Sequence, residues 1–368
     1  MLKKITISLA PLILIFIFIT SFLILDQKSE KVAQSSENIT IEKTKIQPDY
    51  VRAIYLTAYS AGQDDFRKNI IEKIKKGKIN SVVIDIKDYS GYILYDSQLT
   101  EVQNIKASTN QIKDVKKVIK EFHEAGIYLI ARQTVFQDPL LSQTRPDLAF
   151  KTWQGNIWQD NKGLSWLDPS KEETWDYNLA IAREASALGF DEINFDYMRY
   201  PSDGNMANLN YNLPENKNMS EVMSDFFKFL SENLSNKTKI SIDMFGLVMD
   251  HTTDNYDLNI GQRLVDAADY FDYVYPMMYP SHYPLTYLGF ENSAQHPGAV
   301  ISYGLKISAA QIENKRAKIR PWLQAFNIGA IYDSAKINAQ TEAAENATST
   351  AGWALWNARN YYPDYIFN

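Results

Sequence analysis

Short β-branched or aromatic runs alternate with segments of helical periodicity along most of the chain. In the segment 64–76, for example, Phe66, Ile70 and Ile74 recur at four-residue spacing and so share one helix face. Such alternation predicts parallel strands joined by crossover helices. The predicted strands are 51–57, 80–87, 127–134, 190–197, 239–245, 271–279, 319–326 and 352–357. The predicted helices are 64–76, 111–125, 170–188, 220–234, 260–268, 298–315 and 334–349.

Eight strands with helices between them predict an α/β fold, the (β/α)8 TIM barrel, which takes about 250 residues. A hairpin-like insertion with Gly91 at its turn follows the second strand over 89–95. A long loop with several Trp residues separates the third strand from the third helix over 136–164. Ser170 and Glu173 are spaced as a capping box, which predicts the start of that helix.

The N-terminus carries a separate signal. Lys3 and Lys4 precede an uncharged apolar stretch over 5–25, long enough to cross a bilayer. We expect a signal anchor and transmembrane helix over 1–25, a polar linker over 26–49 and one barrel domain over 50–368. The positive-inside rule then places the protein in the cell membrane, with the domain outside the cytoplasm. Secretion after cleavage is the alternative, although no clear small-x-small site follows Leu25.

Composition narrows the function. The net charge of −6 makes nucleic acid an unsuitable partner. The four scattered His and the lack of Cys predict no metal site, and no phosphate-cradling glycine motif points to a nucleotide, so no cofactor is expected. Aromatic residues make up 13% of the chain, which fits either a large aromatic core or a cleft that binds sugar rings.

The fourth and fifth predicted strands carry polar residues on one face. Glu192, Asn194 and Asp196 alternate with apolar residues, and so do Ser241 and Asp243. A barrel strand is largely apolar on both faces, so the polar set must point into the barrel. Catalytic groups of such barrels come from the C-terminal ends of several strands.

Other strands extend this polar ring. Asp85 and Lys87 end the second strand, Arg132 the third, Gln324 lies in the seventh and Asn357 ends the eighth. A buried ion-pair network is the alternative, with pairs such as Asp85–Lys87 or Asp196–Arg199.

Asp196 and Asp243 end neighbouring strands, which lie about 4.8 Å apart. That spacing is near the ~5 Å separation of the two carboxyl groups in a retaining glycosidase. Asp196 would attack the anomeric carbon and Asp243 would protonate the leaving oxygen. Arg199 or Arg132 is suited to keep Asp196 ionised.

Several segments carry a family resemblance. They read LDPS and GFDEINFDYMRYP (within 167–201), VRAIYLTAYSAG (51–62), INSVVIDIKDYSG (79–91), SIDMFG (241–246), DYVYPMMYPSHY (272–283) and GWALWNARN (352–360). The chain resembles a bacterial family of inferred glycoside hydrolase barrels, related to the α-amylase-like and α-galactosidase-like enzymes. The resemblance implies a (β/α)8 fold, a carbohydrate substrate and an acidic nucleophile at Asp196. The amylase-like pattern has an acid on the fifth strand, usually Glu, where this chain has Asp243.

Further candidates for sugar contacts lie after the sixth strand, at Tyr279 and His282, and near the end of the eighth, at Trp356. Each also has a packing interpretation. We predict a retaining glycoside hydrolase that acts on an extracellular or cell-wall polysaccharide. The alternative is a non-catalytic cell-surface protein that binds carbohydrate through the same cleft. A polysaccharide deacetylase would need a His-rich metal set that the sequence lacks.

Overall fold

The computed structural model describes residues 47–251 and 255–368. The predicted apolar span over 5–25 and most of the linker therefore lie outside the described residues. Within the described ranges, no helix combines the length and apolar character needed to cross a membrane. The first strand begins at Val51.

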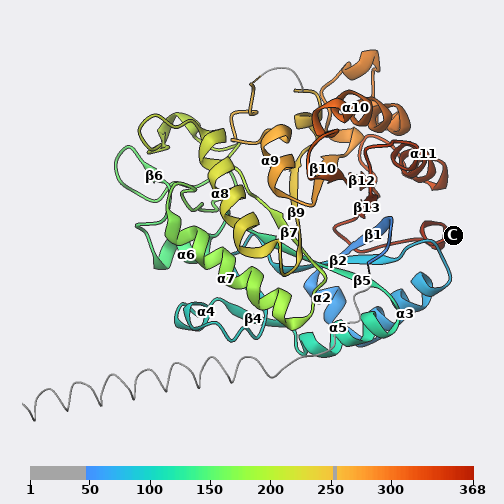
Figure 1. The fold of residues 1–368 in the computed structure, drawn as a ribbon, viewed down its shortest axis with the longest axis horizontal. Coiled ribbons are helices and arrows are strands. Elements are labelled where there is room, and N and C mark those ends of the chain that lie inside the picture. Colours follow the sequence, from blue (N-terminus) through green and yellow to red (C-terminus); the bar gives the residue numbers. More distant parts are fainter. Residues whose placement is uncertain (1–46, 252–254) are drawn as a thin grey trace, which may run out of the picture. The chain divides into compact units, whose positions relative to one another are not determined.

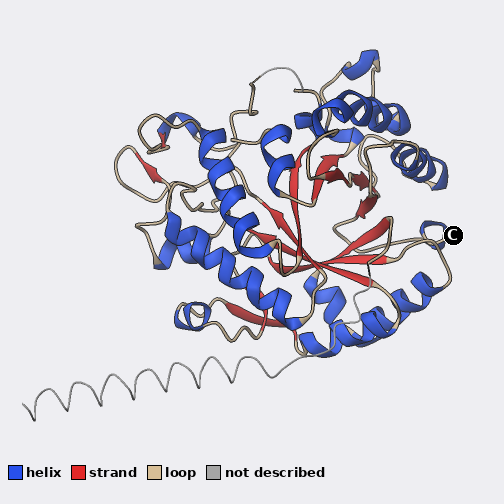
Figure 2. Cartoon of the chain, viewed as in Figure 1, coloured by secondary structure: helices blue, strands red, loops and turns tan. Residues whose placement is uncertain are grey.

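Eight parallel strands form a closed barrel, which confirms the predicted TIM-barrel architecture (Figures 1 and 2). Each strand pairs with the next one along the chain, and the last pairs with the first, Val51 lying opposite Gly352. The barrel strands are β1 (Val51–Leu56), β2 (Ser81–Lys87), β5 (Tyr128–Thr134), β7 (Glu192–Asp196), β9 (Lys239–Phe245), β10 (Tyr273–Met278), β12 (Trp322–Gln324) and β13 (Gly352–Trp356).

Helices surround this barrel and cover its strands (Figure 2). The longer ones are α3 (Asp64–Lys75), α5 (Val115–Glu124), α7 (Glu172–Leu188), α8 (Met219–Leu234), α9 (Leu264–Tyr270), α10 (Pro297–Ile312) and α11 (Ser334–Glu345). Helix α8 shows how they pack, because Phe226, Phe227 and Leu230 are fully buried in the main hydrophobic core. Burial of such side chains contributes about 1.5–3 kcal/mol each.

Shorter elements decorate the barrel. They are α2 (Ala58–Gly62), β3 (Ile93–Tyr95), α4 (Thr100–Asn104), β4 (Ser108–Ile112), α6 (Pro139–Thr144), β6 (Lys151–Thr152), β8 (Leu209–Asn210) and β11 (Lys318–Ile319). The predicted hairpin after the second strand is present, since β3 pairs antiparallel with β2. Gly91 lies in its turn with a φ of +86°, which glycine adopts without steric cost.

The predicted capping box at the start of the third helix is wrong. Helix α7 begins at Glu172, and its cap Lys171 makes no side-chain capping bond. Ser170 instead donates its hydroxyl to Asp168 Oδ1 at 2.7 Å, a local turn in the preceding loop. A capping box does form at α8, between Asn218 and Glu221.

The inner face of β7 is polar, as its alternation predicted. Glu192 accepts hydrogen bonds inside the barrel from Tyr128 (3.0 Å), Ser241 (2.6 Å) and Tyr275 (3.1 Å). The Oε2 atom of Glu192 also forms an ion pair with Arg320 Nη1 at 2.7 Å. This satisfied polar layer supports the residues that follow along β7 toward the C-terminal mouth of the barrel.

Candidate active site

Asp196 and Asp243 lie side by side at the C-terminal end of the barrel. Asn194 is paired with Ser241 and Phe195 with Ile242, so Asp196 and Asp243 occupy the next level of the same register. Neighbouring strands lie about 4.8 Å apart. Residues paired in this way point to the same face, which brings both carboxyl groups into the barrel interior.

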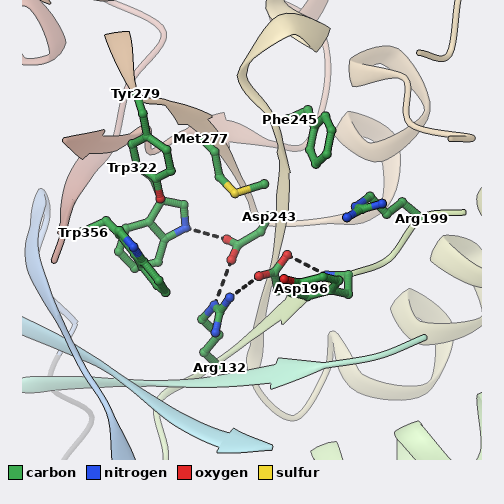
Figure 3. Close-up of a pocket in the computed structure, with 10 residues that line it drawn as sticks. Arg132, Asp196, Arg199, Asp243, Phe245, Met277, Tyr279, Trp322 and Trp356 are labelled. Atoms are coloured by element: carbon green, nitrogen blue, oxygen red, sulfur yellow. Dashed lines mark hydrogen bonds and ion pairs between the residues drawn. The ribbon is translucent and has the colours of Figure 1, made fainter. Parts of the chain in front are cut away.

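One guanidinium joins three carboxyl groups at this level, and its contacts with Asp196 and Asp243 are drawn in Figure 3. Arg132, from β5, contacts Asp85 Oδ1 through Nη1 at 2.7 Å and Asp243 Oδ2 through Nε at 3.3 Å. Its Nη2 makes a close ion pair with Asp196 Oδ2. Burial alone would lower the pKa of Arg132, but Asp196, Asp85 and Asp243 together raise it well above its usual range.

Asp243 is a buried carboxyl group of the pocket. Burial, and after it the charge of Asp196, raise the pKa of Asp243 to about 7. Its Oδ1 accepts hydrogen bonds from Trp322 Nε1 at 2.7 Å and from Asn194 Nδ2 at 2.9 Å. A carboxyl group with this pKa exchanges its proton close to neutral pH, as general acid–base catalysis requires.

Asp196 is held differently. Its Oδ1 accepts the backbone N–H of Tyr197 at 2.6 Å. Tyr197 has a φ of +54°, a left-handed conformation that is unusual for a residue other than glycine. Strained backbone of this kind clusters at functional sites. Here it turns the chain directly after the strand and aims an N–H at the carboxylate.

These carboxyl groups line a pocket of about 550 Å³, with open solvent at its mouth included. The lining consists of Arg132, Asp196, Tyr197, Arg199, Asp243, Phe245, Met277, Tyr279, Trp322 and Trp356.

An aromatic cluster forms one side of the pocket. The rings of Tyr55 and Trp356 stack with centroids 3.9 Å apart, and Trp322 meets Trp356 edge-on at 5.5 Å. Tyr55 also donates its hydroxyl to Asp85 in a short hydrogen bond, and burial raises the pKa of that carboxyl. Flat apolar rings next to polar groups suit a pyranose, which has apolar faces and hydroxyl edges.

A second arginine lines the pocket. Arg199 follows β7 and lies between aromatic rings, with Cζ 4.8 Å from the centre of Phe245 and 4.9 Å from that of Trp166. Burial lowers the pKa of Arg199. No carboxylate of residues 47–251 or 255–368 forms an ion pair with this guanidinium, so the considered pair Asp196–Arg199 is not formed.

The structure brings six of the residues singled out from the sequence into the pocket lining. They are Asp196, Asp243, Arg132, Arg199, Tyr279 and Trp356. Asp85 and Asn194 lie behind the lining, where they hydrogen-bond to Arg132 and Asp243 respectively. Their roles toward a substrate remain predictions.

Three other candidates lie outside the lining. His282 packs edge-on against Tyr279, with ring centroids 5.6 Å apart. Gln324 accepts the N–H of Ser281 at 3.1 Å and donates to nearby backbone carbonyls. Asn357 donates to the carbonyls of Ala325 and Tyr361. The amides of Gln324 and Asn357 thus hold loops at the barrel mouth.

Lys87 does not belong to the polar ring in which the sequence placed it. Its Nζ forms a fully buried ion pair with Asp138 at 2.8 Å, away from the pocket, and not with Asp85. Asp85 is paired with Arg132, but Lys87 is paired with Gln133, so the register shifts at Ile86. An extra residue in a strand reverses the face of the side chains that follow. Alternation alone therefore misplaces Lys87.

Four lining residues were missed by the sequence reasoning. Phe245, Met277 and Trp322 each lie two residues from a chosen candidate on the same strand or its extension. Extending the alternation would have found them. Tyr197 lies on the opposite face by alternation and reaches the pocket only through its positive φ.

Comparison with known proteins supports the same fold. A family profile described as "Putative glycosyl hydrolase domain" matches residues 53–362. The glycoside hydrolase domain of PgaB (BpsB) from Bordetella bronchiseptica aligns with a TM-score of 0.61 at 13% identity, over 87% of this chain and 95% of that one. An α-galactosidase from Thermus thermophilus aligns with a TM-score of 0.53 at 13% identity, over 87% of this chain.

The chain spans only 60% of that α-galactosidase. A hypothetical protein from Ruminiclostridium thermocellum is 37% identical over 52% of this chain and 96% of that one, with a TM-score of 0.49. A search of curated protein sequences gave no significant match. At 13% identity, the structures from Bordetella bronchiseptica and Thermus thermophilus show the shared barrel fold, and the chemistry has to be argued from the site itself.

Proposed function

This chain belongs to the family described as "Putative glycosyl hydrolase domain", and from that membership we propose that it hydrolyses glycosidic bonds with retention of anomeric configuration. Family membership supports glycosidase activity. The observation that carries the retaining mechanism is the pair formed by Asp196 and Asp243, which directly follow the paired residues Phe195 and Ile242 on adjacent strands. A retaining pair requires a separation of ~5 Å, and an inverting pair needs a wider gap for water.

In the proposed first step, an oxygen of Asp196 attacks the anomeric carbon and forms a glycosyl ester. Asp243 donates its proton to the glycosidic oxygen as the bond to the leaving group breaks. In the second step, Asp243 takes a proton from water, the water oxygen bonds to the anomeric carbon, and Asp196 leaves as a carboxylate. The proton returns to Asp243, so the enzyme ends unchanged.

The surroundings of the two groups support these roles. Asp196 contacts Arg132 and accepts the Tyr197 N–H, and these two contacts hold its carboxyl group in place for attack. Asp243 has a pKa raised to about 7. Its Oδ1 already accepts two hydrogen bonds, which leaves Oδ2, with a longer 3.3 Å contact to Arg132, to carry the transferable proton.

Substitution of the two carboxyls tests this proposal. Asp196→Asn should lower kcat by about 10³-fold or more and retain glycan binding. Asp243→Asn should lower kcat and remove the alkaline limb of the pH profile. Asp168→Asn, a buried carboxyl in a loop turn outside the pocket lining, is the matched control. Product anomers would be followed by NMR over a panel of extracellular and cell-wall polysaccharides.

Two results would contradict the proposal. Inversion at the anomeric carbon would exclude Asp196 as the nucleophile. Binding of glycans with no turnover by the wild-type protein would favour a non-catalytic carbohydrate-binding protein.

We also propose that the barrel acts outside the cytoplasm, tethered by the apolar stretch over 5–25. Protease treatment of intact cells should then degrade the barrel domain, and a cytoplasmic marker should survive. N-terminal sequencing of the cell-associated protein distinguishes a retained anchor from a cleaved signal. Protection of the domain in intact cells would refute the extracytoplasmic placement.

A further inference from the structure

Arg199 is a buried cation surrounded by aromatic rings. Its Cζ lies 4.8 Å from the ring centre of Phe245, 4.9 Å from that of Trp166 and 5.3 Å from that of Tyr197. These rings stabilise a positive charge through their π faces. The N–H groups along the edges of the guanidinium remain its means of binding a hydrogen-bond acceptor.

Among the residues that the structure describes, acceptors contact one corner of that guanidinium. Nη1 donates to the Tyr200 carbonyl at 2.9 Å and to Ser202 Oγ at 3.2 Å. Nε and Nη2 donate to no other residue within 47–251 or 255–368. Arg199 lines the pocket, and Figure 3 shows its guanidinium beneath Phe245, pointing toward the side where Asp196 and Asp243 lie.

This arrangement differs from that of Arg132. Arg132 is surrounded by three carboxyl groups of the protein, whereas Arg199 has none within ion-pair distance among the described residues. An arginine stays protonated in proteins, and a buried charge without a partner is costly. The Nε–Nη2 edge presents two parallel N–H groups, a geometry that matches two oxygens of one anionic group.

We propose that Arg199 binds an anionic group on a sugar unit of the substrate, and that the substrate is therefore an acidic glycan such as a polyuronate. This inference rests on the proposed glycosidase function and names the substrate class of the same pocket. Arg132 already neutralises part of the charge of Asp85, Asp196 and Asp243, so Arg199 is the pocket cation left for the substrate. A carboxylate and a phosphate or sulfate ester share the required pair of oxygens.

The test measures how the full-length protein binds and cleaves matched pairs of acidic and neutral glycans. Each polyuronate is paired with its carboxyl-reduced, neutral form, and phosphorylated and sulfated glycans are added. Binding is measured by affinity electrophoresis and turnover by release of reducing ends. The polyuronate should be bound on the order of tenfold to hundredfold more tightly than its reduced form, as charge-assisted bidentate hydrogen bonds predict.

Arg199→Gln should abolish that preference and leave binding of the neutral form nearly unchanged. Arg199→Lys, which keeps the charge but loses the two-pronged edge, should retain only part of it. Arg183→Gln is the matched control, because Arg183 is exposed on α7 and bonds to Asn233. An Arg199-dependent preference for phosphorylated or sulfated glycans alone would assign the anion to an ester and keep the inference.

Equal binding of the polyuronate and its carboxyl-reduced form by the wild-type protein would overturn the inference. An equal loss of affinity for the two forms in Arg199→Gln would also overturn it. Hydrolysis of neutral glycans without an acid preference would refute the acidic substrate and leave the glycosidase proposal intact. Arg199-dependent binding of acidic glycans without any cleavage would support the anion site and count against the hydrolase.

Discussion

Removing the indole donor of Trp322 should raise the pKa of Asp243 and shift the pH dependence of hydrolysis. Trp322 Nε1 donates to Asp243 Oδ1 at 2.7 Å inside a buried pocket. A hydrogen bond to a charged group contributes about 1.5–3 kcal/mol, and one pKa unit corresponds to about 1.4 kcal/mol. The neutral carboxyl group keeps part of this hydrogen bond. The bond therefore stabilises the charged form relative to the neutral form by less than its full free energy.

Trp322→Phe should therefore move the pKa of Asp243 upward from about 7 by about one unit. Because Asp243 acts as the acid, the alkaline limb of kcat/KM should move to higher pH by the same amount. The assay is initial rates of hydrolysis between pH 5 and about 9, at constant ionic strength.

Trp356→Phe provides the matched control. It removes an indole from the same pocket, but Trp322, not Trp356, donates the indole hydrogen bond to Asp243. Trp356→Phe should alter KM through lost ring contact and leave the alkaline limb in place. An unmoved limb in Trp322→Phe, or equal shifts in both variants, would refute the assignment of Asp243 as the titrating acid.

Three further predictions concern stability, each measured by urea unfolding of the full-length protein. Lys87→Ala should lower the free energy of unfolding by about 3–5 kcal/mol, because Asp138 would remain buried and unpaired; a change under about 1 kcal/mol would contradict this. Because the pKa of Asp243 is raised in the folded state, its protonation adds on the order of a few kcal/mol to the free energy of unfolding. This contribution is complete below the unfolded-state pKa of ~4 and is lost as the pH rises to about 7. Asp243→Asn should flatten that pH dependence, and an unchanged slope would speak against it. Gly352→Ala should lower the free energy of unfolding by more than ~1 kcal/mol, since Gly352 has a φ of +146° and an added Cβ would lie 2.4 Å from the Val51 carbonyl oxygen. An unchanged free energy of unfolding would show that the contact between the first and last barrel strands tolerates a side chain.

The barrel was predictable because its signal is local and repeated. Each strand has apolar residues for the helix layer, and each crossover helix has an apolar stripe that must meet it. The start of α7 was not predictable in this way. The spacing of Ser170 and Glu173 fits a capping box, but Asp168 competes for the Ser170 hydroxyl in a tight turn.

The site was predictable where regular alternation continues to the strand end. Asp196 and Asp243 follow unbroken alternation on paired strands, and both reach the pocket. Alternation does not predict the direction of a side chain where the backbone departs from a regular strand. The register shift at Ile86 turns Lys87 away, and the left-handed conformation of Tyr197 turns that side chain in.

The sequence by itself determined the strand–helix order and the polar faces of the inner strands, since both follow from local periodicity and the cost of burying unpartnered polar groups. Only the tertiary structure decided which charges meet. Arg132 joins three carboxyls from three other strands, and Arg199 is left without one among the described residues. Such pairings depend on register and barrel closure, which bring together residues more than 40 positions apart in the chain.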